Sequence, residues 1–333
     1  MDGLVLAWGG IIGFAIIMYV ILDGFDLGIG ILLPFVPDEH DKAIMISTII
    51  QVWDGNQTWL VLGAACLYGA FPTAFSAILP VIYFPILAML IALILRGVAF
   101  EFRLKSTQSI AMWDNVFFIG SLLATFSQGL ILGTFVQGFG DVAPSYLEVP
   151  HYQWLTVFST MTGLGTVFGY VLLGSCWLII KTEGHIQAKA YRFAWISLGL
   201  VLFFMVAFSI WTPFLSDFHF QRWLTIEHIP YLAVLPITTG LCFALCGYAL
   251  YTKREVLPFV MAIAVFLCGA VGVTISVYPY MVPHSLTLAQ AAAPRSSLQF
   301  MLVGVIVMMP FLLLYTLHSY IVFRGKVTKP VHY

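Results

Sequence analysis

The chain has 333 residues, of which 61% are hydrophobic and only 9% are charged, and its formal net charge is −1. Soluble globular domains carry roughly 25% charged residues, so a soluble fold of this length would lack the polar surface needed to cover its apolar side chains. The net charge also excludes the basic surface that nucleic-acid binding requires. The composition therefore predicts one polytopic, all-α integral membrane domain over residues 1–333.

A helix needs about 20 apolar residues to cross the hydrocarbon core of a bilayer. The first such run has neither a basic segment before it nor a small-residue cleavage site, so we interpret it as a span rather than a removed signal. Its second half, residues 23–30, is rich in glycine, which permits a bend. The break at residues 71–73 (FPT) predicts a tight turn between the second and third spans. In chain order, the nine expected spans cover residues 4–33, 43–70, 75–101, 112–137, 154–180, 192–215, 228–250, 256–280 and 298–322.

Basic residues fall mostly on one side of these nine spans. The loops on the side of the N-terminus carry only Arg222 and Arg295, whereas those on the other side carry eleven lysines and arginines. Cytoplasmic loops of membrane proteins are enriched in these residues. We therefore expect the N-terminus to lie outside and the C-terminus in the cytoplasm.

Ionisable residues within the spans are few. Asp23 and Asp26 lie three residues apart in the first span and so share roughly one helical face. Asp54 lies about eleven residues into the second span, roughly 16 Å from its start. Arg96 and Glu101 lie near the end of the third span. With the orientation given above, we expect the three aspartates and the arginine to converge in the cytoplasmic half of the membrane.

Two interpretations of this cluster remain open, and they are compatible. Buried charges are normally paired, so Arg96 can neutralise Asp54 or Asp23 and simply hold the helices together. Carboxylates in a membrane interior also relay protons, and three aspartates beside one arginine leave acidic groups in excess. That excess favours a proton path from the cytoplasm.

The histidines argue against a haem held by this chain alone. A membrane haem needs histidine or methionine ligands on helices that face inward. Of the eight histidines, only His318 falls within an expected span, near its cytoplasmic end. We therefore expect no haem or metal to be bound by this chain by itself.

Several segments resemble signature motifs of one family, subunit II of the cytochrome bd-type quinol oxidases. The stretch DGFDLG resembles the family's D-G-F-D-[LM]-G signature, and WDGNQTWL resembles its W-D-G-N-[QE]-x-W-L signature. The similarity extends in order along nearly the whole chain. The segments that carry it are residues 23–28, 53–60, 96–103, 112–114, 118–121 and 278–283.

The resemblance implies a complex in the bacterial cytoplasmic (inner) membrane that oxidises quinol on the outer side and reduces dioxygen to water. Haem b and haem d would belong to a partner, subunit I, and a small single-span accessory subunit, membrane lipid and quinone are further expected partners. The implied architecture is nine transmembrane helices arranged as two four-helix bundles plus one peripheral helix.

The resemblance also implies roles for particular side chains. Some relatives have a histidine just before the Trp-Asp pair where this chain has Val52, which puts a proton route through that position in doubt. Trp59 would lie beside an apolar route for oxygen. The implied proton pathway comprises Asp23, Asp26, Asp54 and Glu101, supported by Trp53, Arg96 and Asp114.

The residues themselves are compatible with two other functions. A secondary transporter or proton-conducting protein could use Asp23, Asp54 and Arg96, although such proteins often place their site at the midplane between inverted repeats. The sequence has no clear repeat, and its charges lie toward one side. A purely structural scaffold for a redox partner is the second alternative.

Overall fold

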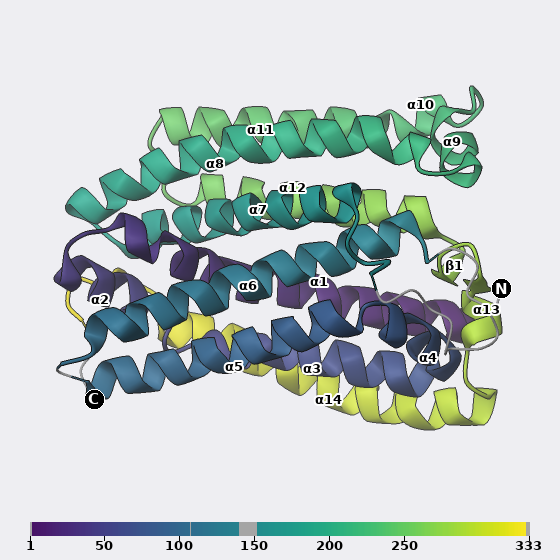
Figure 1. Ribbon diagram of the computed structural model, residues 1–333, viewed down its shortest axis with the longest axis horizontal. Coiled ribbons are helices and arrows are strands. Elements are labelled where there is room, and N and C mark those ends of the chain that lie inside the picture. Colours follow the sequence, from purple (N-terminus) through teal and green to yellow (C-terminus); the bar gives the residue numbers. More distant parts are fainter. Residues whose placement is uncertain (1, 107, 140–151, 331–333) are drawn as a thin grey trace.

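The computed structural model describes residues 2–106, 108–139 and 152–330, and its long helices run nearly parallel to one axis (Figure 1). Within these residues, eight helical segments are long and apolar enough to cross a membrane. The number rises to nine if α3 and α4 together count as one bent span. The prediction of an all-α protein with several membrane spans is thus confirmed. We call the end of the molecule at which α1 begins the N end, and the end at which α1 finishes the C end.

The long helices account for most of the described chain. Asp2 caps the first of them, because its carboxylate accepts a hydrogen bond from the amide of Leu4 at 3.1 Å. The long helices are α1 (Gly3–Leu32), α3 (Trp53–Ala70), α5 (Tyr83–Lys105), α6 (Ile110–Gln137), α7 (Val157–Lys181), α8 (Gly184–Trp211), α11 (Val234–Tyr251), α12 (Leu257–Val277) and α14 (Arg295–Val322).

Shorter elements connect them. In the one described hairpin, β1 and β2 pair antiparallel, with Tyr280 opposite Thr287. The short elements are the 3-10 helices η1 (Leu33–Phe35) and η2 (Thr212–Phe214), the helices α2 (Glu39–Ser47), α4 (Pro72–Val81), α9 (Asp217–Leu224), α10 (Ile229–Leu232) and α13 (Leu288–Ala291), and the strands β1 (Tyr280–Val282) and β2 (Leu286–Thr287).

Helix α1 lies in the middle of the packing, where it contacts α3, α6 and α7. Helices α5, α6, α7 and α8 pack in sequence, each on the next, and α11 pairs with α12 on the side of α7 and α8 (Figure 1). Helix α14 packs mainly on α3, and none of the residues in its most apolar stretch is buried. The chain therefore leaves a broad apolar face along α14.

The second predicted span, residues 43–70, is divided into two helices. Helix α2 ends at Ser47, residues 48–52 form turns, and α3 begins at Trp53. The apolar side chains between these helices, including Ile49 and Val52, are buried in the protein's own core. The predicted start of the second span at residue 43 is therefore wrong, because this apolar run folds back on the protein instead of extending the helix through lipid.

The third predicted span, residues 75–101, is divided as well. The axis of α4 is bent by 119° from that of α3, and α5 begins only at Tyr83. Pro72 lies in the first turn of α4, where the missing amide proton of proline is tolerated. The turn predicted at residues 71–73 is confirmed, but the following residues form α4, which contacts β1 and α13.

Other departures are smaller. The sixth predicted span begins at Gly184 rather than residue 192, and α9, α13 and the β1–β2 hairpin were not predicted. Residues 23–30 remain α-helical within α1, so their glycines do not break the helix.

Candidate functional site: a buried ion pair in a hydrogen-bonded network

The centre of the candidate site is an ion pair between α1 and α5. Arg96 Nη1 donates a hydrogen bond to Asp23 Oδ1 at 2.7 Å, and both side chains are fully buried. Removing two charges from water is costly unless they pair closely. The contact therefore explains how an arginine side chain can be buried inside the helix bundle.

A second carboxylate on the same face of α1 is held by neutral groups. Asn56 Nδ2 donates to Asp26 Oδ2 at 2.8 Å and to the carbonyl oxygen of Leu22 at 3.1 Å. The hydroxyl of Tyr320 donates to Asn56 Oδ1 at 2.9 Å, so Asn56 links α1, α3 and α14. Among the described residues no cation forms an ion pair with Asp26. Two buried carboxylates thus share one guanidinium, and one acid can carry a proton without leaving a charge unpaired.

The network continues from Asp23 toward the N end. Tyr19 precedes Asp23 by one helical turn, and its hydroxyl interacts with the Asp23 carboxylate. Gln128 Nε2 donates to the Tyr19 hydroxyl at 2.8 Å, and the Tyr170 hydroxyl donates to Gln128 Oε1 at 2.7 Å. Polar side chains of α1, α6 and α7 therefore form a continuous hydrogen-bonded chain with the ion pair.

Several buried polar atoms of this network have no hydrogen-bond partner among the described residues. Buried polar groups of this kind usually bind ordered water. A cavity of about 10 Å³ lies between α3 and α14, next to Asn56 and Tyr320, which is room for about one water molecule. The arrangement suits a chain of carboxyl groups and waters. The atoms without a partner are Asp23 Oδ2, Asp26 Oδ1, Arg96 Nε and Nη2, and Ser121 Oγ.

Glycines allow the helices to approach closely enough to form the network. A Cβ at Gly28 would lie 1.9 Å from the carbonyl oxygen of Tyr170, and one at Gly174 would lie 2.8 Å from the backbone of Gly28. A Cβ at Gly120 would lie 2.8 Å from the carbonyl oxygen of Ala92, where α6 crosses α5. Small residues at crossing points are typical of membrane helix packing. Residues 23–30 therefore present a glycine surface to α7 and their aspartates to the network.

The two tryptophans of the WDGNQTWL segment both lie near the network. The ring of Trp53 stacks on that of Phe100, with 5.2 Å between centroids, and lies 5.7 Å from the guanidinium carbon of Arg96. Trp59 is buried against Phe14, with 5.7 Å between ring centroids. The predicted role of Trp59 beside an oxygen route stays a prediction.

Asp54 does not join the ion pair. It lies in the first turn of α3 and is exposed at the surface of the chain, while Asn56, two residues later, points inward. Asp54 therefore does not pack into the buried cluster of Asp23, Asp26 and Arg96, and its place in the cytoplasmic half of the membrane stays a prediction. Its depth was counted from residue 43, but α3 begins at Trp53, and residues two apart on a helix face different directions.

Glu101 and Asp114 lie toward the C end and form other ion pairs. Glu101 is exposed and lies 3.5 Å from Lys105 Nζ. Arg103 Nε donates to Asp114 Oδ1 at 2.5 Å, and Lys42 Nζ lies 3.3 Å from Asp114 Oδ2. These contacts connect α2, α5 and α6 near the surface.

Sequence reasoning missed the neutral members of the network. The neutral side chains that were not predicted are Asn56, Gln128, Tyr19, Tyr170 and Tyr320. The two amides stand in otherwise apolar spans, which was an available signal because a polar side chain in a membrane helix needs a partner. Their partners lie on distant segments of the chain and could not be read from spacing.

The histidines bear on the expectation that this chain binds no haem by itself. His318 is exposed on α14, and no group of three or more histidine, cysteine, aspartate or glutamate residues within the described chain could hold a metal ion. His151 and His332 lie outside the described residues. The expectation that this chain binds no haem by itself stays a prediction.

The fold and the network define a polytopic, all-α membrane protein with paired charges and hydrogen-bonded amides inside its helix bundle. The sequence matches the family described as cytochrome bd terminal oxidase subunit II over residues 4–323. The chain therefore belongs to this family, whose members are subunits of a quinol:dioxygen oxidoreductase complex.

Individual relatives agree with this assignment. Cytochrome bd ubiquinol oxidase subunit 2 of Bacillus subtilis (strain 168) is 29% identical over 331 residues, which are 96% of each chain. Cytochrome bd-I ubiquinol oxidase subunit 2 of Escherichia coli (strain K12) is 25% identical over 358 residues, 97% of this chain and 94% of the relative.

A solved structure shares the fold. A chain of the bd oxidase from Geobacillus thermodenitrificans superposes with a TM-score of 0.76 at 17% identity, covering 97% of this chain and 100% of that one. These comparisons support an oxidase subunit and give no support to a free-standing transporter.

Proposed function

We propose that this chain is subunit II of a complex that oxidises quinol at the outer side of the bacterial cytoplasmic membrane and reduces dioxygen to water. Family membership supports the reaction of the complex, and the buried network supports a role in proton delivery. The N-terminus would lie outside and the C-terminus in the cytoplasm, because basic residues concentrate in the loops at the C end. The ion pair then belongs to the cytoplasmic half of the membrane.

The helix contacts support an arrangement in two four-helix bundles. One would contain α1, α3, α5 and α6, and the other α7, α8, α11 and α12. Helix α14 would be the peripheral helix, since it packs mainly on α3.

We propose that a haem-bearing partner, subunit I, covers the apolar face formed by α3 and α14. Asp54 supports this assignment, because a carboxylate at this level of the bundle would be costly to expose to hydrocarbon. Haem b and haem d in that partner would supply the redox chemistry, and quinol would be the substrate of the complex. A small single-span accessory subunit and membrane lipid are further proposed partners.

The proposed proton route begins at the cytoplasmic surface, where Glu101 collects protons, and passes Asp54 on the covered face of α3. Water in the cavity between α3 and α14 would carry the protons past Asn56 to the carboxylate of Asp26, which the Asn56 amide holds in position. A water between Asp26 Oδ1 and Asp23 Oδ2, the two free carboxylate oxygens, would allow the proton to pass on. Arg96 would stabilise the carboxylate that remains after transfer. The observation that carries this route is that two buried carboxylates share a single cation.

Replacement of Asp26 by asparagine tests the route, because it removes the titrating group and keeps the volume. We expect oxygen uptake per assembled Asp26→Asn complex to fall about tenfold or more, since positioned proton transfer typically contributes at least 10²-fold. Asp54→Asn should also slow turnover. The matched control is Glu183→Gln, an exposed acid at the start of α8. Normal oxygen uptake by purified Asp26→Asn complex would contradict a proton role for the network.

A further inference from the structure

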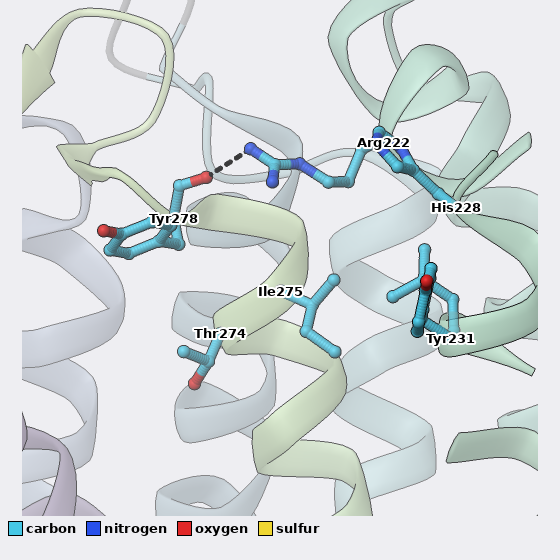
Figure 2. Close-up of a pocket in the computed structure, with 7 residues that line it drawn as sticks. Arg222, His228, Tyr231, Thr274, Ile275 and Tyr278 are labelled. Atoms are coloured by element: carbon cyan, nitrogen blue, oxygen red, sulfur yellow. Dashed lines mark hydrogen bonds between the residues drawn. The ribbon is translucent and has the colours of Figure 1, made fainter. Parts of the chain in front are cut away.

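A cavity away from the ion pair lies at the N end. It has a volume of about 310 Å³ and opens between α12 and the segment formed by α9 and α10 (Figure 2). Figure 2 shows Arg222 reaching across its upper side toward the end of α12. The residues that line this α9–α12 cavity are Arg222, His228, Tyr231, Leu232, Thr274, Ile275 and Tyr278.

Arg222 is fixed in place but keeps hydrogen-bond donors free. Its Nη2 donates to the carbonyl oxygen of Tyr278 at 2.8 Å, and its guanidinium carbon lies 5.2 Å from the ring centre of Phe218. Trp223 Nε1 donates to Ser276 Oγ at 3.0 Å, which holds α9 against α12. Within the described residues Arg222 forms no ion pair with a carboxylate. A guanidinium has five N–H donors, so most of them remain available to an anion.

The rest of the cavity is amphipathic. Exposed His228 and Tyr231 supply polar groups beside Arg222, while Leu232 and Ile275 supply apolar walls. Below the cavity, α11 and α12 present outward faces of exposed aliphatic side chains, namely Val234, Ile237, Leu241, Leu267 and Val271. The cation lies at the end of two membrane helices, and the apolar surface follows along them. This order matches a phospholipid, in which the charged phosphate lies at one end and the hydrocarbon chains follow.

We propose that the α9–α12 cavity binds the phosphodiester group of a membrane phospholipid, with Arg222 as the phosphate ligand and Tyr231 and His228 as hydrogen-bond partners. The planar guanidinium fork matches phosphate oxygens and binds them through two parallel hydrogen bonds. The acyl chains lie along α11 and α12. A neutral quinone ring fits these observations less well, because it carries no charge for an arginine without a carboxylate partner.

Native mass spectrometry of the intact, purified complex tests this site, with phosphatidylglycerol as the added lipid. Loss of charge-assisted hydrogen bonds worth about 1.5–3 kcal/mol corresponds to a factor of roughly ten or more in affinity. We therefore expect Arg222→Gln to weaken retention of one lipid by about tenfold or more. Arg222→Lys should retain more lipid than Arg222→Gln, and Tyr231→Phe should fall between wild type and Arg222→Gln.

Arg295→Gln is the matched control, because Arg295 is another exposed cation at the N end and lies outside the cavity. Retention equal in wild type and Arg222→Gln would overturn the proposal. So would retention of inorganic phosphate in place of lipid, or displacement of the lipid by a quinone that depends equally on Arg222. If Arg222→Gln fails to assemble, Arg222→Lys and Tyr231→Phe still decide the question, because both should retain less lipid than wild type and Arg295→Gln.

Discussion

Arg96 and Asp23 form a fully buried ion pair with 2.7 Å between Nη1 and Oδ1, yet Arg96 Nε, Arg96 Nη2 and Asp23 Oδ2 have no hydrogen-bond partner among the described residues. A purely structural ion pair would be expected to satisfy most of its polar atoms, because an unpaired buried group is costly. The free atoms, together with the nearby carboxylate of Asp26, indicate a hydrated site. Pairing and the proposed proton transfer are therefore compatible roles of one cluster.

Removing the arginine should destabilise the protein strongly. Arg96→Met leaves the Asp23 carboxylate buried without a cation, and loss of one partner of a buried pair lowers the free energy of unfolding by about 3–5 kcal/mol. The melting temperature of the purified complex measures this loss. The double variant Arg96→Met/Asp23→Leu removes both charges and should recover a large part of it. Equal melting of wild type and Arg96→Met would show that the pair does not hold α1 against α5.

The crossing of α1 and α7 predicts a sharp contrast between two glycines of one helix. A Cβ at Gly28 would lie 1.9 Å from the carbonyl oxygen of Tyr170, whereas one at Gly10 meets nothing within 4 Å. Gly28→Ala should therefore lower stability by about 3 kcal/mol, the upper end of overpacking costs, because backbone must move. Gly10→Ala should leave the melting temperature unchanged or slightly raised. Similar effects of the two substitutions would contradict the close approach.

Much of the fold could be predicted because hydropathy follows directly from residue type. The start of α3 could not, because residues 44–52 are as apolar as a membrane span and only tertiary packing decides that they turn back into the core. The wrong start of this span also gave a wrong expected depth for Asp54. The bend after α3 shows the opposite case, since Pro72 marks the break locally.

The sequence predicted the charged residues of the candidate site but not the neutral side chains that connect them. Asp23, Asp26 and Arg96 stood out because ionisable side chains are rare within membrane spans. The pairing of Arg96 with Asp23 rather than Asp54 depends on which way each helix faces its neighbours. Asn56 and Tyr320 meet across 264 positions of sequence, and no local pattern reports such a contact.

The ion pairs at the C end should contribute to stability in proportion to their burial. Asp114 accepts from Arg103 Nε at 2.5 Å and both side chains are largely buried, so Asp114→Asn should cost about 2–3 kcal/mol, the range of hydrogen bonds to charged groups. Glu101→Gln breaks an exposed pair four residues apart and should cost below about 0.5 kcal/mol. Thermal unfolding of both variants measures the difference, and equal losses would contradict this ranking.

A histidine pair at the N end predicts a pH dependence of stability. Burial and the neighbouring His284 lower the pKa of His219 to about 4, below the usual value of 6.5. Above pH 6.5 the imidazole is neutral in folded and unfolded chains alike. Between pH 6.5 and 4 only the unfolded chain takes up the proton, so stability falls as pH falls through this window.

We expect this loss to be about 1–2 kcal/mol after solvent screening. Melting temperatures measured from pH 7.5 to 4.5 detect it, and His219→Gln should flatten the profile in that window. The control is His40→Gln, an exposed histidine at the C end. An unaltered slope in His219→Gln would assign the pH dependence to other groups.

Substitution of Asn56 tests most directly whether its amide connects the cavity with the Asp26 carboxylate. Asn56→Leu keeps the number and branching of side-chain heavy atoms but removes the donor to Asp26 Oδ2 and the acceptor of the Tyr320 hydroxyl. If the amide holds water and Asp26 in line, oxygen uptake per assembled complex should fall about tenfold. Thr58→Val is the matched control, because its exposed hydroxyl bonds only within α3.

The pH profile separates proton delivery from a loss of structure. When proton uptake limits the rate, the deficit of Asn56→Leu should deepen as the pH of the cytoplasmic side rises from 6 to 8, because each unit lowers the proton concentration tenfold. A structural defect would scale the rate equally at every pH. A profile parallel to that of the wild type would therefore reduce Asn56 to a packing role, and a profile that diverges at high pH would place it on the path of the proton.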